Sequence, residues 1–367
     1  MLFSILTLMM TGSTLQHIED TGIYQPLLPG EVHVSPDGDV WLLDFANATV
    51  LHFDANGQKK ANIASKGEGP GEVKQPEQFF VNDKFLYIYD RSNGAISKYA
   101  RNGKFIRRLQ PPAQKLSIAK VTSGWIYGNW KTAADEEQPA SIVWANEDFS
   151  QTRKLLEIKD PGTNSGLALS MRGSETFADF YPIPIMPKLV ASPDGKFAFL
   201  AETNGVKIHV ISGGDSSIQK VITQNQASVP FDREWGELRL QKAIEMLPAQ
   251  YRSVKVESHF PERFPVIREL LVTSGNNLAV MRWAGNPDKN KPHLLFDSSG
   301  KTLSPDLDWT TLERIVGMND QWAWVTVFDQ EDEEAGILRC PRDQMQETIR
   351  KNPILYEGSS GRIFSGN

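Results

Sequence analysis

The sequence contains almost no cysteine and no hydrophobic run long enough to span a membrane. Cys340 is the only cysteine among 367 residues, which excludes a disulfide framework within the chain and a zinc site built from cysteines. The apolar run Leu2–Met10 is too short to cross a bilayer as a helix. Lysine and arginine do not gather into a basic stripe and the formal net charge is −6, so nucleic acid is not an expected partner.

The sequence does contain enough apolar material for a large core, and an N-terminal segment like an export signal. Hydrophobic residues make up 40% of the chain and charged residues 23%, as in globular proteins. The run Leu2–Met10 precedes small polar residues around Gly12 and Ser13, which resembles a secretory signal without its usual basic start. We therefore expect residues 1–20 to be a leader and the protein to be periplasmic or secreted. The alternatives are a first strand or a misassigned start.

A repeated double hairpin organises the rest of the chain. In residues 32–64, two pairs of strands surround the turns 36–38 and 55–57, whose glycines supply the positive φ that a tight turn needs. The pattern returns at later segments that begin near Phe79, Ala119, Leu189, Leu270 and Arg314. Six copies of four short strands, about 40 to 47 residues apart where no insertion intervenes, predict an all-β fold. This fold is a six-bladed β-propeller of four-stranded antiparallel blades, formed as a single domain by residues 21–367.

The first repeats resemble a known family. The pattern D-x-x-N-x-x-V-x-x-F-D-x-x-G from Asp44 to Gly57, with Gly71-Glu72-Val73-x-x-Pro76 after it, is similar to the repeats of six-bladed propellers related to NHL repeats. The sequence GPGE resembles the first connection between blades in a bacterial exported group of these proteins. The resemblance covers about the first 110 residues. A closed ring removes the exposed sheet edges of such blades, so we expect Gly22–Leu28 or Ile354–Tyr356 to complete a blade begun at the other terminus.

The long connections between blades predict which face of the propeller binds. Turns within the hairpins are short, whereas residues 160–187 and 223–265 form long insertions that fall on the opposite face. The second insertion predicts a short helix, which Asp232 caps, Pro248 ends, and whose apolar face carries Trp235, Leu238 and Ile244. Two insertions on one face favour a wall or lid over the channel mouth. The alternative is that they only cap the ring.

The glycine-rich segment Lys66–Val73 is better explained as a corner than as a phosphate site. A phosphate-binding loop needs a Lys-Ser/Thr pair and a following helix, and neither occurs here. Its glycines allow the chain to leave an outer strand and cross toward the axis. Backbone amides and Glu72 of this corner remain candidates for ligand contact.

Polar and aromatic residues at the ends of the second strands form the main candidate binding ring. Tryptophan supplies a flat apolar surface and arginine a planar set of donors, so the ring suits a small polar ligand, a glycan, a peptide or a protein. With Glu72, the candidate ligand-binding residues are Asp44, Asn47, Asp90, Arg91, Trp130, Lys131, Glu202, Arg282 and Trp283.

A calcium ion in the channel is the candidate cofactor. Glu31, Glu77 and Glu269 align at one register of the first strands, and converging carboxylates bind calcium. Lys188 at the equivalent place in another blade favours salt bridges instead. The resemblance implies a channel metal only for lactonase-type members, whose mixed Asn, Asp and Glu ligands have no counterpart here. The histidines show no spacing typical of zinc, and His33, His52 and His209 are expected to pack on strands.

Together these patterns predict a non-catalytic, monomeric binding propeller that uses the face of the insertions. The alternative is a metal-dependent hydrolase of the lactonase or gluconolactonase type on the same face. A structural assembly partner is a third interpretation. Catalytic residues cannot be named, because the sequence contains no GxSxG motif and indicates no Ser-His-Asp set.

Overall fold

The computed structural model describes most of the chain between residues 32 and 351. The described residues are 32–35, 37–112, 117–129, 140–158, 166–172, 175–182, 187–202, 205–245, 247, 252, 254–272, 277–282, 293–297, 299–303, 315–318, 322–329 and 334–351. The predicted leader and both terminal strand candidates lie outside these ranges.

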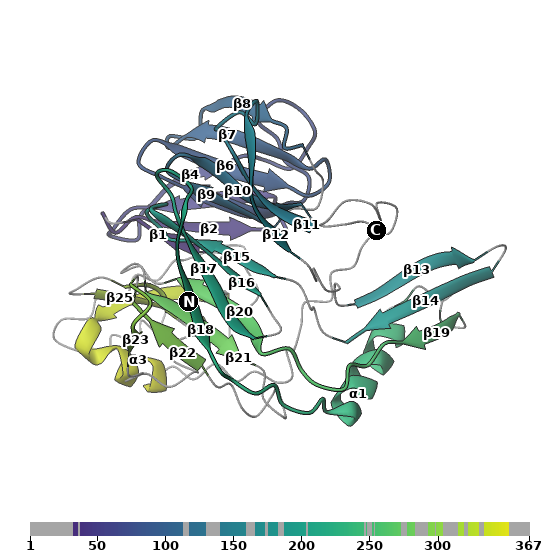
Figure 1. The fold of residues 1–367 in the computed structure, drawn as a ribbon. Helices are drawn as coiled ribbons and strands as arrows, with labels where there is room; N and C mark the ends of the chain where they lie inside the picture. Colours follow the sequence, from purple (N-terminus) through teal and green to yellow (C-terminus); the bar gives the residue numbers. More distant parts are fainter. Residues whose placement is uncertain are drawn as a thin grey trace, which may run out of the picture. The chain divides into compact units, whose positions relative to one another are not determined.

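The chain divides into two compact units, and the first contains three antiparallel sheets (Figure 1). The first sheet is formed by β1 (Val32–Val34), β2 (Val40–Asp44), β3 (Thr49–Phe53) and β4 (Lys59–Ile63). The second is formed by β5 (Pro76–Val81), β6 (Phe85–Asp90), β7 (Ala95–Ala100) and β8 (Phe105–Leu109). The third contains β24 (Ile315–Met318), β25 (Trp322–Asp329) and β26 (Glu334–Pro341), followed by the 3-10 helix η2 (Arg342–Gln344) and helix α3 (Met345–Lys351).

The second unit contains three further four-stranded antiparallel sheets and a sheet formed by the insertions. The first is β9 (Ile118–Val121), β10 (Gly124–Asn129), β11 (Ala140–Ala145) and β12 (Thr152–Ile158). The next is β15 (Lys188–Ala191), β16 (Phe197–Glu202), β17 (Val206–Ser212) and β18 (Ile218–Gln224). The last is β20 (Ile267–Val272), β21 (Leu278–Arg282), β22 (His293–Phe296) and β23 (Thr302–Leu303). The insertions add β13 (Gly166–Arg172), β14 (Glu175–Tyr181), helix α1 (Arg233–Glu245) and β19 (Lys255–Ser258).

The predicted repeats correspond to these blade sheets, and five of the six have four strands. Their tight turns form as predicted: Gly38, Gly57 and Gly103 have positive φ, and each amide bonds the carbonyl three residues earlier. First strands of different blades lie side by side within each unit: β1 contacts β24, and β15 contacts both β9 and β20. This is the arrangement that a propeller gives to its innermost strands.

The last blade departs from the predicted pattern. Each repeat was predicted to contain four strands, but after β26 the chain forms η2 and α3. Met345 and Ile349 are one helical turn apart and both are buried, which gives α3 an apolar face that packs against β25 and β26. The sheet therefore has three strands within the described residues.

The second strands β2 and β6 bury both of their faces, whereas the outer strands β4 and β8 are largely exposed. In β2, Val40 and Leu42 belong to the core shared with β24–β26, whereas Trp41 and Leu43 belong to the core shared with β5–β8. Alternate side chains of a strand point to opposite faces. Continuous apolar runs such as that in β2 are therefore typical of a strand between two packed sheets.

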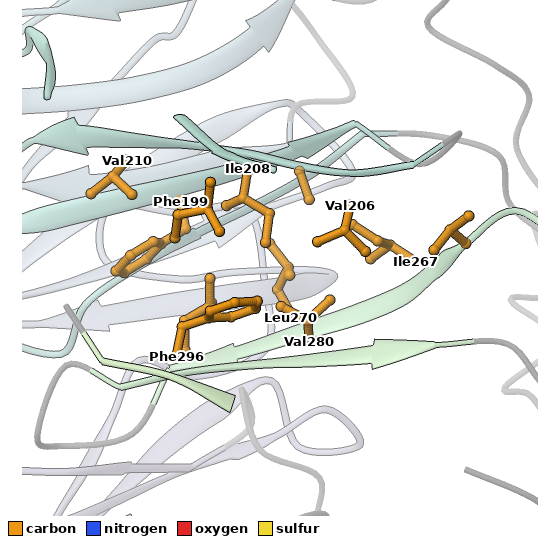
Figure 2. Close-up of a cluster of buried hydrophobic side chains, with 12 residues drawn as sticks. Phe199, Val206, Ile208, Val210, Ile267, Leu270, Val280 and Phe296 are labelled. Atoms are coloured by element: carbon orange, nitrogen blue, oxygen red, sulfur yellow. The ribbon is translucent and has the colours of Figure 1, made fainter. Parts of the chain in front are cut away.

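The core between the sheets β15–β18 and β20–β23 is drawn in Figure 2. Phe199 and Ile208 of the first sheet meet Leu270, Val280 and Phe296 of the second, and all five side chains are at most 2% exposed. Burying one such side chain contributes about 1.5 to 3 kcal/mol. These clusters give consecutive blades their cohesion.

Candidate functional site

The two long insertions pair with each other to form one sheet. The first insertion supplies the hairpin β13–β14 and the second supplies β19. Strands β14 and β19 run parallel, with Phe177 opposite Lys255 and Asp179 opposite Glu257. The sequence predicted that both insertions lie on one face, and this ladder joins them directly into what we call the insertion sheet, β13–β14–β19 (Figure 1).

The second insertion leaves and rejoins the blades through a short antiparallel leg. Pro230 pairs with Arg263, the Phe231 amide donates to the Glu262 carbonyl over 3.0 Å, and the Phe264 amide donates to the Val229 carbonyl over 2.9 Å. The leg, residues 228–231 and 262–264, therefore closes the excursion at its base. Between the two sides of the leg, α1 and β19 are the described elements, and together with β13 and β14 we call them the insertion lobe.

An aromatic cluster attaches helix α1 to the insertion sheet. Its members are Phe180, Phe231, Trp235, Phe260 and Phe264, whose ring centroids lie 4.9 to 6.4 Å from their neighbours. The predicted helix begins as expected, since the Trp235 amide donates to the Asp232 carboxylate over 3.0 Å. Trp235 is buried, but Leu238 is 52% exposed, so its predicted place on the apolar face is wrong.

The insertion sheet is amphipathic across β14 and β19. Ala178 and Phe180 of β14 are buried, whereas Phe177, Asp179 and Tyr181 are partly exposed. In the parallel ladder Lys255 is opposite Phe177 and Glu257 is opposite Asp179, so these four side chains share one face. We call this face, with residues 177, 179, 181, 255, 257 and 259, the polar platform.

Three metal-ligating side chains meet on the polar platform. Ligand atoms of Asp179, Glu257 and His259 all lie within 4.8 Å of one another. His259 Nε2 is 3.0 Å from Asp179 Oδ1, the His259 amide donates to the Phe180 carbonyl, and the imidazole stacks on Tyr181 at 4.6 Å. His259 thus lies beside two carboxylates, although the spacing of the histidines in the sequence is not typical of zinc. The available signal was Glu257-x-His259, with Glu257 on β19 and His259 directly after this strand, but Asp179 is 80 positions from His259 in the chain.

The acidic residues predicted as a binding ring do end the second strands, but two of them hold backbone in place. Asp44 is buried and accepts from the Asn47 amide and side chain, over 3.0 and 2.7 Å. Asp90 is buried and accepts from the amides of Lys74, Gln75 and Ser92, over 2.8, 3.1 and 2.9 Å. Carboxylates used in this way secure the blade connections.

Two other members of the predicted ring, Glu202 and Arg282, also have hydrogen-bond or ion-pair partners. Glu202 is 2.8 Å from both Lys207 Nζ and His209 Nε2. Burial is the largest single effect and raises the pKa of Glu202, but the hydrogen bonds and charges of these two partners together lower it below its usual range. Arg282 Nη1 donates to Gln226 Oε1 over 2.7 Å at the root of the leg. Arg91 is exposed at the start of the β6–β7 turn. Trp130, Lys131 and Trp283 lie outside the described residues.

The glycine-rich segment forms a corner that is held by hydrogen bonds within the segment and by Arg108. Glu72 accepts from the Gly69 amide over 2.8 Å, the Gly67 amide donates to the Val73 carbonyl, and Arg108 donates to the carbonyls of Gly69 and Glu72. Gly71 adopts a φ of 79°, which favours glycine. The amides of Gly67 and Gly69 are thus bonded within the corner, and Glu72 serves the turn.

The three glutamates predicted to hold calcium are not described as a set. Glu31 and the side chain of Glu269 lie outside the described residues. Glu77 falls at a bulge between Pro76 and Gln78, whereas Glu269 pairs with Met281, so the two ladders give them different registers. Burial raises the pKa of Glu77, and Arg91 opposes the shift. The channel calcium stays a prediction.

Comparison with known proteins supports the fold. Residues 30–181, less than half of the chain, match a family model described as a 6-bladed beta-propeller (DUF5128). The chain is a β-propeller. Its predicted resemblance to six-bladed propellers is therefore confirmed. The chain is similar in fold to a candidate exported protein from Bacteroides fragilis, with 14% identity and a TM-score of 0.52. The match covers 90% of this chain and 94% of that protein.

Two more distant structures are enzymes or binding proteins by name. A gluconolactonase from Xanthomonas campestris has 12% identity and a TM-score of 0.40, covering 89% of this chain and 88% of its own. The calcium-binding protein regucalcin from Agrobacterium tumefaciens has 12% identity and a TM-score of 0.38, covering 90% and 92%. Similarity this low carries no argument on activity. Among curated proteins there is no significant match, and no helix in the described part of the propeller is long and apolar enough to cross a membrane.

Proposed function

We propose that this propeller is a non-catalytic binding protein that recognises a polar ligand on the platform of its insertion sheet. One observation supports this most: two insertions separated in sequence by a whole blade join into a single amphipathic sheet. The sheet has its own aromatic packing and a partly exposed face of mixed charge. A propeller needs no such addition to complete its blades.

The residues on the platform indicate the chemistry of the ligand. Phe177 and Tyr181 offer ring surfaces, Lys255 lies 5.9 Å from the Phe177 ring, and Asp179 with Glu257 supply carboxylates. Aromatic surfaces beside both signs of charge suit a glycan, a short peptide or a polar metabolite. Export to the periplasm or beyond fits the run Leu2–Met10 and the candidate exported protein of similar fold.

The test uses an excision variant that the leg makes possible. Phe231 and Glu262 are hydrogen-bonded in antiparallel fashion, so an Asn-Gly turn can replace residues 232–261 without moving the leg. The intact chain and this variant are screened by thermal shift against defined oligosaccharides, peptides and polar metabolites. A ligand at about 100 times its Kd stabilises the folded state by about 2.7 kcal/mol.

Point variants distinguish a loss of ligand binding from misfolding of the excision variant. Lys255→Glu reverses an exposed charge on the platform, and Lys59→Glu makes the same change on the exposed outer strand β4. We expect one compound class to raise the Tm of the intact chain and of Lys59→Glu, but not of Lys255→Glu or the excision variant. Stabilisation that survives excision contradicts the proposal, as does the absence of any stabilising class. Turnover of gluconolactone or other lactones by the excised protein supports the hydrolase alternative.

A further inference from the structure

We propose that Asp179, Glu257 and His259 bind one divalent transition-metal ion of the zinc class. The three residues form the Asp–Glu–His cluster of the polar platform, with ligand atoms within 4.8 Å of one another. Within the described ranges, no other group of three such side chains comes this close together. The cluster is distinct from the channel glutamates and does not depend on the proposed ligand.

The donor set determines the class of metal. One imidazole nitrogen with two carboxylates suits zinc, manganese, iron or nickel, whereas calcium prefers oxygen ligands alone. Ligand atoms about 2.0 to 2.2 Å from a common ion lie about 3 to 4 Å from one another. The observed spread of up to 4.8 Å therefore requires only small side-chain rotations. Three protein ligands leave at least one position for water or a bound molecule.

The backbone brings the ligands to one face. Asp179 and Glu257 are directly opposite in the parallel ladder, and His259 directly follows β19, where its amide donates to the Phe180 carbonyl. Carboxylates placed directly opposite repel each other, and a shared cation removes that repulsion. The His259 ring is held by its stack on Tyr181, with ring planes 11° apart, and by the bond from its amide to Phe180.

The metal would join the two insertions. Asp179 comes from the first insertion, and Glu257 with His259 from the second. The ladder between them contains only Lys255–Ser258 of β19, a short parallel pairing. A bound ion therefore adds a cross-link at the joint, and metal binding should slow local opening of β19. The alternative is a simple His259–Asp179 ion pair that needs no metal.

The experiment titrates the full chain, free of metal, with Zn²⁺ by calorimetry and with Co²⁺ by visible absorption. Glu257→Gln is the main variant because Glu257 is exposed and its change preserves size. Glu262→Gln is the matched control, since it removes the same charge from an exposed residue outside the cluster. His259→Gln is the second variant, and circular dichroism checks that each folds.

We expect one Zn²⁺ per chain, bound at least tenfold more weakly by Glu257→Gln and His259→Gln and unchanged by Glu262→Gln. Zn²⁺ should also slow hydrogen exchange at the amides of Lys255–Ser258 without affecting β6 and β7. Equal affinity in all variants, or no binding to the intact chain, overturns the proposal. Loss of ligand binding in the compound screen leaves the metal result unaffected, so the two proposals fail separately.

Discussion

At the scale of single residues, acidic side chains at blade corners stabilise the backbone conformation by accepting its hydrogen bonds. Asp44 and Asp90 both end second strands and both accept hydrogen bonds from nearby chain. These bonds are physically simple, because a short acidic side chain can cap amides two or three residues away, but the sequence pattern was interpreted as a ligand-binding ring instead. Because both carboxylates are buried and hydrogen-bonded, their role in ligand binding stays a prediction.

Substituting Asp90 therefore tests a structural role. Asp90→Ala leaves the amides of Lys74, Gln75 and Ser92 without their acceptor at a partly buried corner. We expect the free energy of unfolding to fall by about 2 to 4 kcal/mol, because each unsatisfied buried group costs about 1 to 3 kcal/mol and water recovers part of it. Urea denaturation measures the change.

Asp83→Ala provides the comparison, because Asp83 is exposed in the β5–β6 turn. Its effect should stay within about 0.5 kcal/mol. If the two variants lose equal stability, Asp90 has no special role in stabilising the fold. If Asp90→Ala instead keeps full stability and loses binding of a ligand, the result supports the predicted binding ring.

At the scale of elements, hairpins were predictable and the final helix was not. Turns with glycine at the positive-φ position mark β-hairpins locally, so β1 to β8 follow from short stretches of sequence. In the described residues 342–351 the buried apolar side chains are Met345 and Ile349, whose spacing fits a helix but is too short to be decisive. The repeat favoured a strand there, and packing against β25 and β26 favours α3.

Helix α3 should control access to Cys340. The Cys340 side chain is buried on β26, and burial raises the pKa of its thiol, with Thr348 of α3 as an opposing hydrogen-bond partner. Ile349→Ala removes buried contacts of α3 and is expected to cost about 2 to 4 kcal/mol. Local opening then raises the rate of reaction with Ellman's reagent at least tenfold, since each 1.4 kcal/mol is a factor of ten in the open population.

Glu347→Ala makes the same truncation on the exposed side of α3 and should leave the thiol protected. Equal reactivity of Cys340 in the two variants would mean that α3 does not cover it. Fast reaction of the unmodified protein would contradict the buried position of the thiol.

Prediction also fails where two strands far apart in sequence meet. The insertions were recognisable by their length, and Asp232 correctly marks the start of α1. The pairing of β14 with β19 has no local signal, because it depends on where the leg and the neighbouring blades bring the two insertions. The Asp–Glu–His cluster results from this pairing, which is why the histidine pattern alone did not predict it.

At the scale of the whole molecule, apolar packing is unevenly distributed between the blades and the insertion lobe. The core in Figure 2 combines many side chains from two blades. In the cluster that attaches α1, the side chains of Trp235 and Phe264 are buried, with Val229 and Phe231 partly buried against them. Regions with fewer buried apolar contacts open at lower free energy. The lobe should therefore open before the blades.

Native-state hydrogen exchange with two phenylalanine variants tests this order. Phe296→Ala removes a fully buried ring from the blade core and should lower the free energy of the main urea transition by about 3 to 5 kcal/mol. Phe260→Ala removes a partly buried ring that bridges Phe180 and Phe231, so it should speed exchange in α1 and β19 while leaving β16 and β17 protected. A lobe that opens alone can change conformation on binding a ligand or metal without lowering the stability of the blades. If Phe260→Ala lowers the main transition as much as Phe296→Ala does, the insertion sheet is part of the cooperative blade core, and a separate binding lobe is contradicted.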